Sequence, residues 1–280
     1  MEKKSFEEHV IHGTAGFPMA VYSFNPKDKI ALPIHYHKEF EFLILRRGNA
    51  KIQLENVSVC LNPMEGVFVN SDTLHSAVNL GNSTCSFVAI VFSPEFITRE
   101  YDNIYIKFIR PLIKNELTLP VKLPKDVVDL ALETHSLFNK EEFGYELAIK
   151  GNIANMLSIC IANSTRQDNV KNDGKAEIVK KVLDYIHINY GNNISLYDLS
   201  LQAHTSKEHL CRIFREVSEI SPIVYLNKYR IMQSSYMLCG TDKSISEISA
   251  DCGFNNSSYF NKIFMRFMKC TPTEYRRSKR

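Results

Sequence analysis

The sequence predicts an α+β multidomain fold: first a β-barrel or sandwich, then a helical segment, and finally an all-α C-terminal domain. Three observations predict it. From about residue 17 to 92, short runs of β-branched and aromatic residues, such as "EFEFLILRRGNAKIQL" and "SFVAIVF", alternate with turn formers such as "NPMEG". After Ser93 the apolar residues recur at helical spacing. The last hundred residues contain one helical pattern twice.

Length and composition fit a globular protein with two domains, since 44% of its 280 residues are hydrophobic and 23% are charged. The start, "MEKKSFEEHV", lacks the apolar stretch of a signal peptide, and the longest apolar runs are too short to span a bilayer. Seven cysteines without a C-x-x-C pair argue against a disulfide framework and a zinc ribbon. We therefore expect a cytoplasmic protein without a membrane partner.

The segment after the β-rich part is predicted to be helical. Ser93 and Pro94 are typical of a helix start, and "YELAIKGNIANMLSICIA" carries an apolar stripe at helical spacing. Two interpretations of this stripe stay open: a helix pair that packs on its own domain, or a subunit interface that makes a homodimer. The stretch "NSTRQDNVKNDGK" that follows has one large apolar residue, Val170, and predicts a linker.

The expected domains are therefore four segments. Residues 1–94 are expected to form the barrel, 95–163 a helical dimerisation segment, 164–175 the linker, and 176–280 the all-helical domain.

The C-terminal repeat is the most informative feature of the sequence. Phe214, Pro222 and Tyr225 recur as Phe264, Pro272 and Tyr275, each shifted by 50 positions. Each copy predicts a short helix, a tight turn and a second helix, with Ser206 or Asn256 placed to cap the second helix.

The second helix of each copy is amphipathic. In the first copy Leu210, Ile213, Phe214 and Val217 fall on one side, opposite a polar face with arginines. Such a helix can lie in a DNA major groove. Residues 176–280 also hold 15 Lys/Arg against 10 Asp/Glu, a mild indication of a polyanionic partner. The alternative is an ordinary helical bundle, which the tandem repetition makes the weaker interpretation.

This segment resembles the DNA-binding domain of AraC/XylS-type transcription regulators, through "GFNNSSYFNKIF" followed by "TPTEYRR". The resemblance implies two helix-turn-helix units joined by a long helix, "VYLNKYRIMQSSYML", with recognition helices in successive major grooves of double-stranded DNA. The expected DNA-binding residues are Ser206, Lys207, Glu208, Cys211, Arg212, Arg215, Asn256, Ser257, Ser258, Asn261, Lys262 and Arg266.

The chain departs from the family pattern where the recognition helices end. The family commonly has glycine three residues before the S/T-P proline, but here those positions hold Glu219 and Lys269. If the backbone turns left-handed there, each substitution costs about 1 kcal/mol relative to glycine.

The stretch "HYHKEFE" in the β-rich part is a candidate ligand site. Along an unbroken strand His35, His37 and Glu41 would point to one side. The spacing H-x-H-x3-E-x6-G, with His75 further on, resembles the cupin barrel over roughly residues 20–92. In metal-binding cupins, the resemblance implies, such residues hold one divalent ion; here they would be His35, His37, Glu41 and His75. The second motif departs from the usual pattern, because "PMEG" replaces P-x-G and the gap from Gly66 to His75 is long.

Three interpretations of these residues stay open. They form a divalent-metal site, a metal-free effector pocket, or a structural group satisfied by the backbone. We favour an effector pocket that requires no cofactor, and we add Arg46 to its candidate residues, since an inward arginine can bind a carboxylate or phosphate. The sequence thus predicts a transcription regulator, not an enzyme, whose barrel senses an unknown small molecule. The alternative is a metal-dependent cupin enzyme with a helical appendage.

Overall fold

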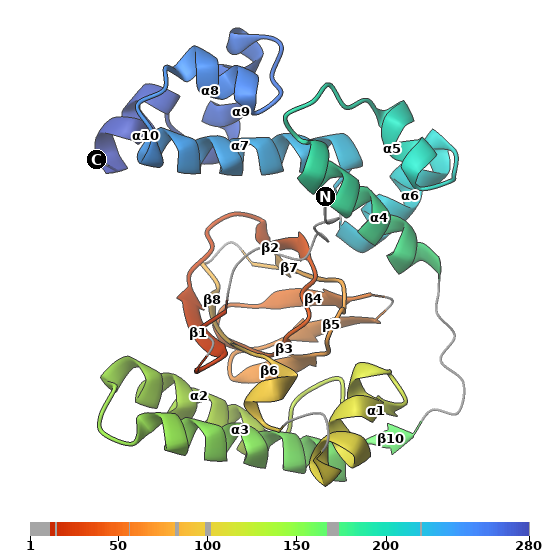
Figure 1. Ribbon diagram of the computed structural model, residues 1–280, viewed down its shortest axis with the longest axis vertical. Helices are drawn as coiled ribbons and strands as arrows, with labels where there is room; N and C mark the ends of the chain where they lie inside the picture. The colour runs from red at the N-terminus through yellow and green to blue at the C-terminus, as the bar shows by residue number, and fades with distance from the viewer. Residues whose placement is uncertain are drawn as a thin grey trace. The chain divides into compact units, whose positions relative to one another are not determined.

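A computed structural model describes residues 12–14, 16–55, 57–81, 84–98, 102–166, 174–218 and 220–279. The chain divides at Gly174 into two compact units. The first unit is rich in antiparallel sheet, and every element of the second unit is a helix (Figure 1). The predicted combination of a β-rich N-terminal part and an all-helical C-terminal part is confirmed.

Two four-stranded antiparallel sheets form the centre of the N-terminal unit (Figure 1). The first has the order β1-β8-β3-β6 and the second the order β2-β7-β4-β5. The strands are β1 (Met19–Phe24), β2 (Ile30–His35), β3 (Phe40–Arg47), β4 (Ala50–Leu54), β5 (Val57–Leu61), β6 (Glu65–Val69), β7 (His75–Asn79) and β8 (Ser86–Phe92).

Strand β3 is buried on both faces because its alternate side chains enter two different cores. Leu43 and Leu45 pack with residues of the second sheet, in the interior that the two sheets share. Phe42 and Ile44 point the opposite way and pack with apolar residues of the helices that follow the sheets. The period of two along a strand assigns each residue of β3 to one core or the other.

The helical segment covers the outer face of the first sheet. It contains the 3-10 helix η1 (Pro94–Phe96), the π-helix η2 (Tyr105–Ile109), α1 (Arg110–Ile113), the short strand β9 (Leu117–Thr118), α2 (Lys125–Lys140) and α3 (Tyr145–Ala162). The apolar stripe of α3 is fully buried in the core that the sheet and helices share. This stripe therefore packs on its own unit, the first of the two interpretations offered above.

The expected linker, 164–175, differs from the structure at both ends. Strand β10 (Thr165–Arg166) pairs with β9, so the chain is still part of the N-terminal unit there. At the other end, Gly174 already belongs to α4 (Gly174–Asn189). Residues 167–173 lie outside the described residues.

The C-terminal unit consists of two helical pairs arranged around one long helix. After α4 come α5 (Leu196–Gln202), α6 (Lys207–Ser218), α7 (Pro222–Gly240), α8 (Ile245–Asp251), α9 (Ser257–Met268) and α10 (Pro272–Lys279). The two pairs begin alike: Ser195 and Asp198 form a capping box at α5, and Ser244 and Glu247 form one at α8. Local sequence thus starts both copies of the repeat in the same way.

None of the helices in the described ranges has the length and apolar character needed to cross a membrane.

Candidate functional site

Helices α6 and α9 expose the polar faces that the sequence predicts. The predicted caps are confirmed, since Ser206 accepts a hydrogen bond from the His209 amide (3.1 Å) and Asn256 accepts one from the Tyr259 amide (2.9 Å). The predicted stripe of α6 is buried. Of the twelve predicted DNA-binding residues, Cys211 is partly buried and the other eleven are exposed.

Arg212 is held within its own helix. Its Nη1 donates to Glu216 Oε1 at 2.6 Å, and its Nη2 lies 3.1 Å from His209 Nδ1. The hydrogen bond from Arg212 lowers the pKa of Glu216, so this carboxylate stays charged beside the exposed arginine. At the equivalent position of α9, Lys262 is exposed, and no carboxylate pairs with it among the described residues.

Sequence reasoning missed two exposed residues of α9. Met265 is 45% exposed and Tyr259 47% exposed, which gives the second helix an apolar component that the first lacks. Met265 lies 50 positions after Arg215, a predicted DNA-binding residue of the first copy, so the repeat itself could have identified Met265 as a residue of the exposed face. The apolar side chain is suited to contact with a thymine methyl group.

Lys269 ends α9 in the left-handed region, with φ 60° and ψ 12°. The departure from glycine therefore leaves the shape of this helix end unchanged and places a side chain in a strained conformation. The corresponding residue of the first copy, Glu219, lies outside the described residues.

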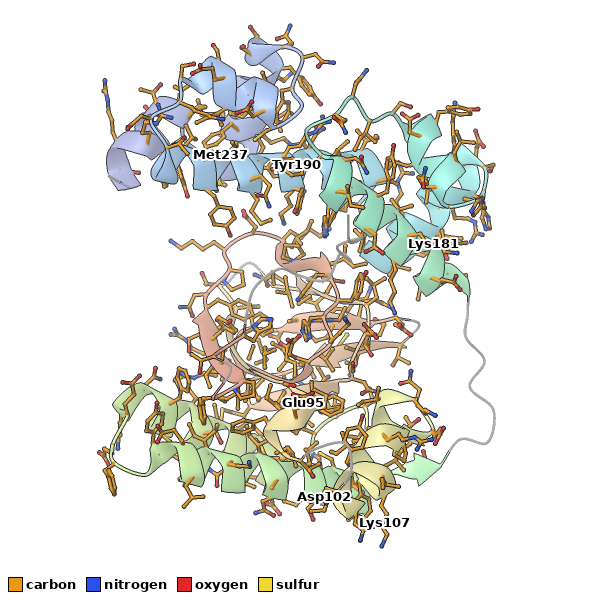
Figure 2. All side chains as sticks on the ribbon, viewed as in Figure 1. Glu95, Asp102, Lys107, Lys181, Tyr190 and Met237 are labelled. Atoms are coloured by element: carbon orange, nitrogen blue, oxygen red, sulfur yellow. The ribbon has the colours of Figure 1, made fainter. Side chains whose placement is uncertain are left out.

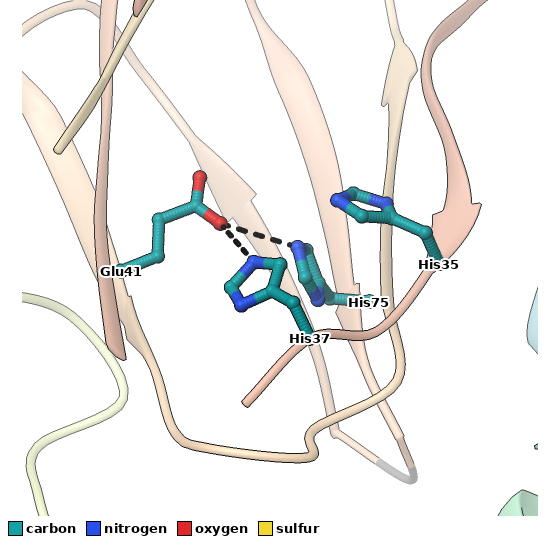
Figure 3. Close-up of side chains that lie close together, drawn as sticks. All are labelled: His35, His37, Glu41 and His75. Atoms are coloured by element: carbon teal, nitrogen blue, oxygen red, sulfur yellow. Dashed lines mark hydrogen bonds and ion pairs between the residues drawn. The ribbon is translucent and has the colours of Figure 1, made fainter. Parts of the chain in front are cut away.

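Four side chains converge inside the N-terminal unit (Figure 3). His35 ends β2, His37 lies in the bend after it, Glu41 lies on β3 and His75 begins β7. One ligand atom from each lies within 4.8 Å of the others. The expectation of an unbroken strand through this stretch is wrong, because the chain bends between β2 and β3. The bend brings His37 back toward Glu41, with His37 Nε2 and His75 Nε2 each 3.2 Å from Glu41 Oε2.

Backbone carbonyls determine which nitrogen of each histidine faces the cluster. Nδ1 lies 2.8 Å from the Pro33 oxygen in His35, 3.1 Å from the Glu39 oxygen in His37 and 2.8 Å from the Thr73 oxygen in His75. Because a carbonyl only accepts, each Nδ1 carries the hydrogen. In a neutral ring, Nε2 then carries a lone pair and no hydrogen.

The pKa shifts of Glu41 and His35 favour a charged carboxylate beside neutral imidazoles, which is the combination that binds a cation. Burial alone raises the pKa of Glu41, but His37 and His75, whose Nε2 atoms lie 3.2 Å from its Oε2, hold that pKa well below its usual value. Burial lowers the pKa of His35 well below its usual value, and His75 and His37 lower it further. A carboxylate that faces imidazole lone pairs needs a proton or a metal ion between them. Three Nε2 donors and a carboxylate, oriented by backbone carbonyls, fit a divalent transition metal.

A cavity of about 280 Å³ adjoins the cluster. His35, His37 and Glu41 line it together with the polar residues Tyr22 and Ser23 of β1 and with apolar residues of β1, β2 and β8, namely Phe24, Leu32, Ala89 and Val91. His12, which the sequence analysis did not single out, also lines it. Its Nδ1 lies 2.9 Å from the Tyr22 hydroxyl, and its buried Nε2 has no hydrogen-bond partner among the residues that the structure describes. No spacing or motif marks His12 in the sequence, so only the fold reveals it.

The placement of Arg46 in this pocket is wrong. Arg46 lies on the same face of β3 as Phe42 and Ile44, and this face points away from the interior that the two sheets share. It lines a separate hollow of about 560 Å³ with His135 and Lys140 of α2. The period of two along the strand therefore excludes Arg46 from the cavity that Glu41 enters.

Comparisons with known proteins find a matching domain and relatives along most of the chain. A family described as a helix-turn-helix domain matches residues 199–278. The uncharacterized HTH-type transcriptional regulator YdeC of Bacillus subtilis (strain 168) is 25% identical over 98% of this chain and 97% of its own length. The HTH-type regulator YdiP of Escherichia coli (strain K12) is 27% identical over 91% of this chain and 84% of its own length. A solved structure of ToxT from Vibrio cholerae is 18% identical and covers 92% of this chain and 97% of that chain, with a TM-score of 0.43.

The conclusion rests on the matching domain and the sequence relatives, since a TM-score below 0.5 adds no weight. These relatives are named as transcription regulators, which decides against the alternative of a metal-dependent enzyme. The exposed faces of α6 and α9 lie within the matched residues. Residues 199–278 thus match a helix-turn-helix domain, and the chain is similar over most of its length to proteins named as HTH-type transcriptional regulators.

Proposed function

We propose that the chain is an AraC-type transcription regulator that contacts DNA through both helical pairs and is controlled by a small molecule bound in its N-terminal unit. The observation that carries the proposal is the duplication: α6 and α9 bury matching apolar residues and expose polar faces at a constant offset. Each pair is then a helix-turn-helix unit, with α6 and α9 as its recognition helices.

The exposed side chains suit base and phosphate contacts. Arg212 has the fork that binds guanine, and Asn261 has the amide that pairs with adenine. Lys207, Arg215 and Lys262 supply positive charge for phosphates. The set proposed from the sequence is kept, with Met265 and Tyr259 added for apolar contact.

The effector site is the cavity beside His35, His37, Glu41 and His12. The two facing antiparallel sheets and the inward histidines support a cupin-like barrel. The lining of the cavity combines apolar side chains with a few polar groups, as small-molecule sites usually do. The buried Nε2 of His12, which has no partner within the described part of the chain, would gain a hydrogen bond from a ligand hydroxyl.

A divalent ion in the His35, His37, Glu41 and His75 cluster is a second candidate feature of this site. When bound, such an ion supplies a Lewis-acidic position for an oxygen of the effector. The three backbone carbonyls hold the imidazoles in the tautomer that a metal requires. Elemental analysis of purified protein tests this: we expect one ion per chain, lost in His75→Ala and retained in His135→Ala, which removes a histidine outside the cluster.

The helical segment, residues 95–163, is the proposed homodimer interface. The inward stripe of α3 is occupied by its own core, so the interface uses other residues. Phe143, in the loop between α2 and α3, and Leu147, in the first turn of α3, are 110% and 78% exposed, which makes them the favoured contact residues. A second copy of the chain would remove both from water.

Effector control follows from differential affinity. A ligand shifts an equilibrium between arrangements of the two units only by binding one arrangement better than the other. The test is a footprint on DNA upstream of the protein's own gene, with and without a panel of sugars, sugar acids and amino acids. A ligand-dependent change that His12→Ala abolishes, with ligand-free DNA binding intact, supports the proposal. The same ligand response in the variant contradicts it.

A further inference from the structure

Arg230 lies buried in the middle of α7, at 7% exposure. Arginine is seldom fully buried unless its charge has partners. Here Nε donates to the Tyr190 oxygen at 2.8 Å and Nη2 donates to the Asn192 oxygen at 2.7 Å. The guanidinium also lies over the ring of Phe254, 5.5 Å from its centre.

These contacts join the two helical pairs. Tyr190 and Asn192 belong to the segment between α4 and α5, which leads into the first pair. Phe254 belongs to the turn between α8 and α9, within the second pair. One side chain therefore touches the entrance of the first pair and the turn of the second.

The backbones of these two segments also meet directly. A Cβ atom on Gly253, which has φ +78°, would lie 2.3 Å from the Tyr190 oxygen and 2.8 Å from Arg230 Nη2. A Cβ atom on Gly191 would lie 2.8 Å from the Asp251 oxygen. Both points of approach have a glycine, because any side chain there would force the segments apart.

The side chain of Tyr190 completes the junction. Like Met237 of α7, it packs against the apolar core of the second pair; both residues are labelled in Figure 2. Its ring meets Tyr229 of α7 edge-on, with centroids 5.4 Å apart. A residue that follows α4 in the chain thus contributes to the core that positions α9.

We propose that Arg230 is a positioning residue that fixes the distance and angle between the two recognition helices, and so the spacing between the two DNA segments that the protein accepts. This inference rests on the proposed function that both pairs contact DNA. Arg230 and the Gly253 contact make the two pairs one rigid body instead of two units that hinge about α7.

A rigid pair of recognition helices is sensitive to DNA spacing. One inserted base pair moves the second segment by about 3.4 Å and rotates it by about 35°, since a turn of about 34–36 Å holds 10–10.5 base pairs. If the two helical pairs could hinge about α7, the second recognition helix would follow the displaced DNA segment. If the pairs are fixed relative to each other, one recognition helix loses its contacts with DNA.

The test uses the full-length protein and a site selected from random DNA. The affinity for this site is compared with that for a duplex that carries one inserted base pair between the two protected segments. We expect the insertion to weaken wild-type binding by about 10-fold or more, the worth of a lost base contact. For Arg230→Met and for Gly253→Ala, we expect the penalty to fall to about 3-fold or less, with weaker binding to the original site. Arg230→Met keeps most of the side-chain length, and Gly253→Ala disturbs the same contact from the opposite side.

Arg215→Met is the matched control, since it removes an exposed arginine from the recognition helix α6. It should weaken binding to both duplexes while leaving their ratio at the wild-type value. Hydrogen exchange of α6 and α9 verifies that each pair stays folded in the variants, and Gly253→Ala replaces Arg230→Met if the latter unfolds.

The outcomes separate this inference from the function on which it rests. If the variants weaken binding to both duplexes equally, Arg230 only stabilises the domain and the inference is overturned. A wild-type protein that tolerates the insertion while protecting two segments also overturns the inference alone. A selected site with a single protected segment instead overturns the proposal that both pairs contact DNA.

Discussion

Arg212 forms an ion pair within α6, and this pair does not prevent it from binding a base. An exposed ion pair contributes about 0.2–1 kcal/mol, whereas a bidentate contact with guanine discriminates by about 1–3 kcal/mol. Arg212 can therefore exchange Glu216 for a base when DNA approaches. The intrahelical pair holds the side chain at the surface until then.

We expect Arg212→Ala to weaken binding to the specific site by about 1–3 kcal/mol and to relax selectivity at one base position. The measurement is a mobility-shift titration against the site and its single-base variants. Glu216→Gln is the control; it removes the competing carboxylate and should leave the affinity unchanged or raise it. An equal loss on random DNA would show that Arg212 contacts only phosphate.

Lys269 occupies a left-handed position that glycine adopts without strain. We expect Lys269→Gly to raise the free energy of unfolding of the C-terminal unit by roughly 0.5–1 kcal/mol. Hydrogen exchange of peptides from α9 and α10, measured without DNA, reports this change. Lys269→Ala separates backbone strain from charge, because it removes the charge but keeps the Cβ atom, and it should give no gain.

At the scale of elements, α3 has a buried face and an exposed end with different roles. Met156 is fully buried between the helices and the first sheet. We expect Met156→Ala to lower the free energy of unfolding of the N-terminal unit by about 2–5 kcal/mol, through lost contacts and a cavity. Urea unfolding followed by hydrogen exchange in β3 and α3 measures it.

Leu147 on the same helix is the matched comparison. Leu147→Ala should change the stability of the monomer by only about 0.5 kcal/mol or less, since the residue is exposed. The same substitution should weaken self-association in sedimentation velocity. A fully monomeric wild-type protein would refute the proposed interface.

Strand β3 illustrates how far periodicity alone reaches. Its alternation assigns Leu43 and Leu45 to one core and Phe42 and Ile44 to another. The same rule, applied one pair further, excludes Arg46 from the ligand cavity. The sequence does not reveal the bend after His35, because nothing local distinguishes a continuous strand from two strands of different sheets.

At the scale of the molecule, charge is distributed unevenly between the two parts. The net charge is only +3, yet residues 176–280 carry 15 basic and 10 acidic residues. This excess belongs to the part that we propose to bind DNA. Phosphate contacts release counterions, so binding must respond to salt.

We expect the logarithm of the association constant to fall linearly with the logarithm of salt concentration. About six phosphate contacts correspond to a loss of roughly 10³-fold between about 50 and 200 mM salt. Fluorescence anisotropy with labelled duplex measures the slope, and Lys262→Ala should reduce it by about one unit if Lys262 contacts phosphate. A flat response would contradict electrostatic DNA binding.

The sequence by itself determined the local features of the protein. Helix caps at Ser206 and Asn256, the buried stripe of α6 and the repeat at an offset of 50 depend on neighbours a few residues away, so patterns reveal them. These features also sufficed to predict the helix-turn-helix domain that matches residues 199–278, because such a helix pair is a local structure.

Only the tertiary structure decided what depends on contacts between distant segments. In the folded chain His75 lies beside Glu41, and His12 lines the cavity. Arg46 lines a different hollow, and Arg230 lies between two segments of the helical unit. The physical reason is that such contacts require the whole chain to close on itself. Burial and hydrogen bonding between remote residues then select their geometry, and no local spacing records that selection.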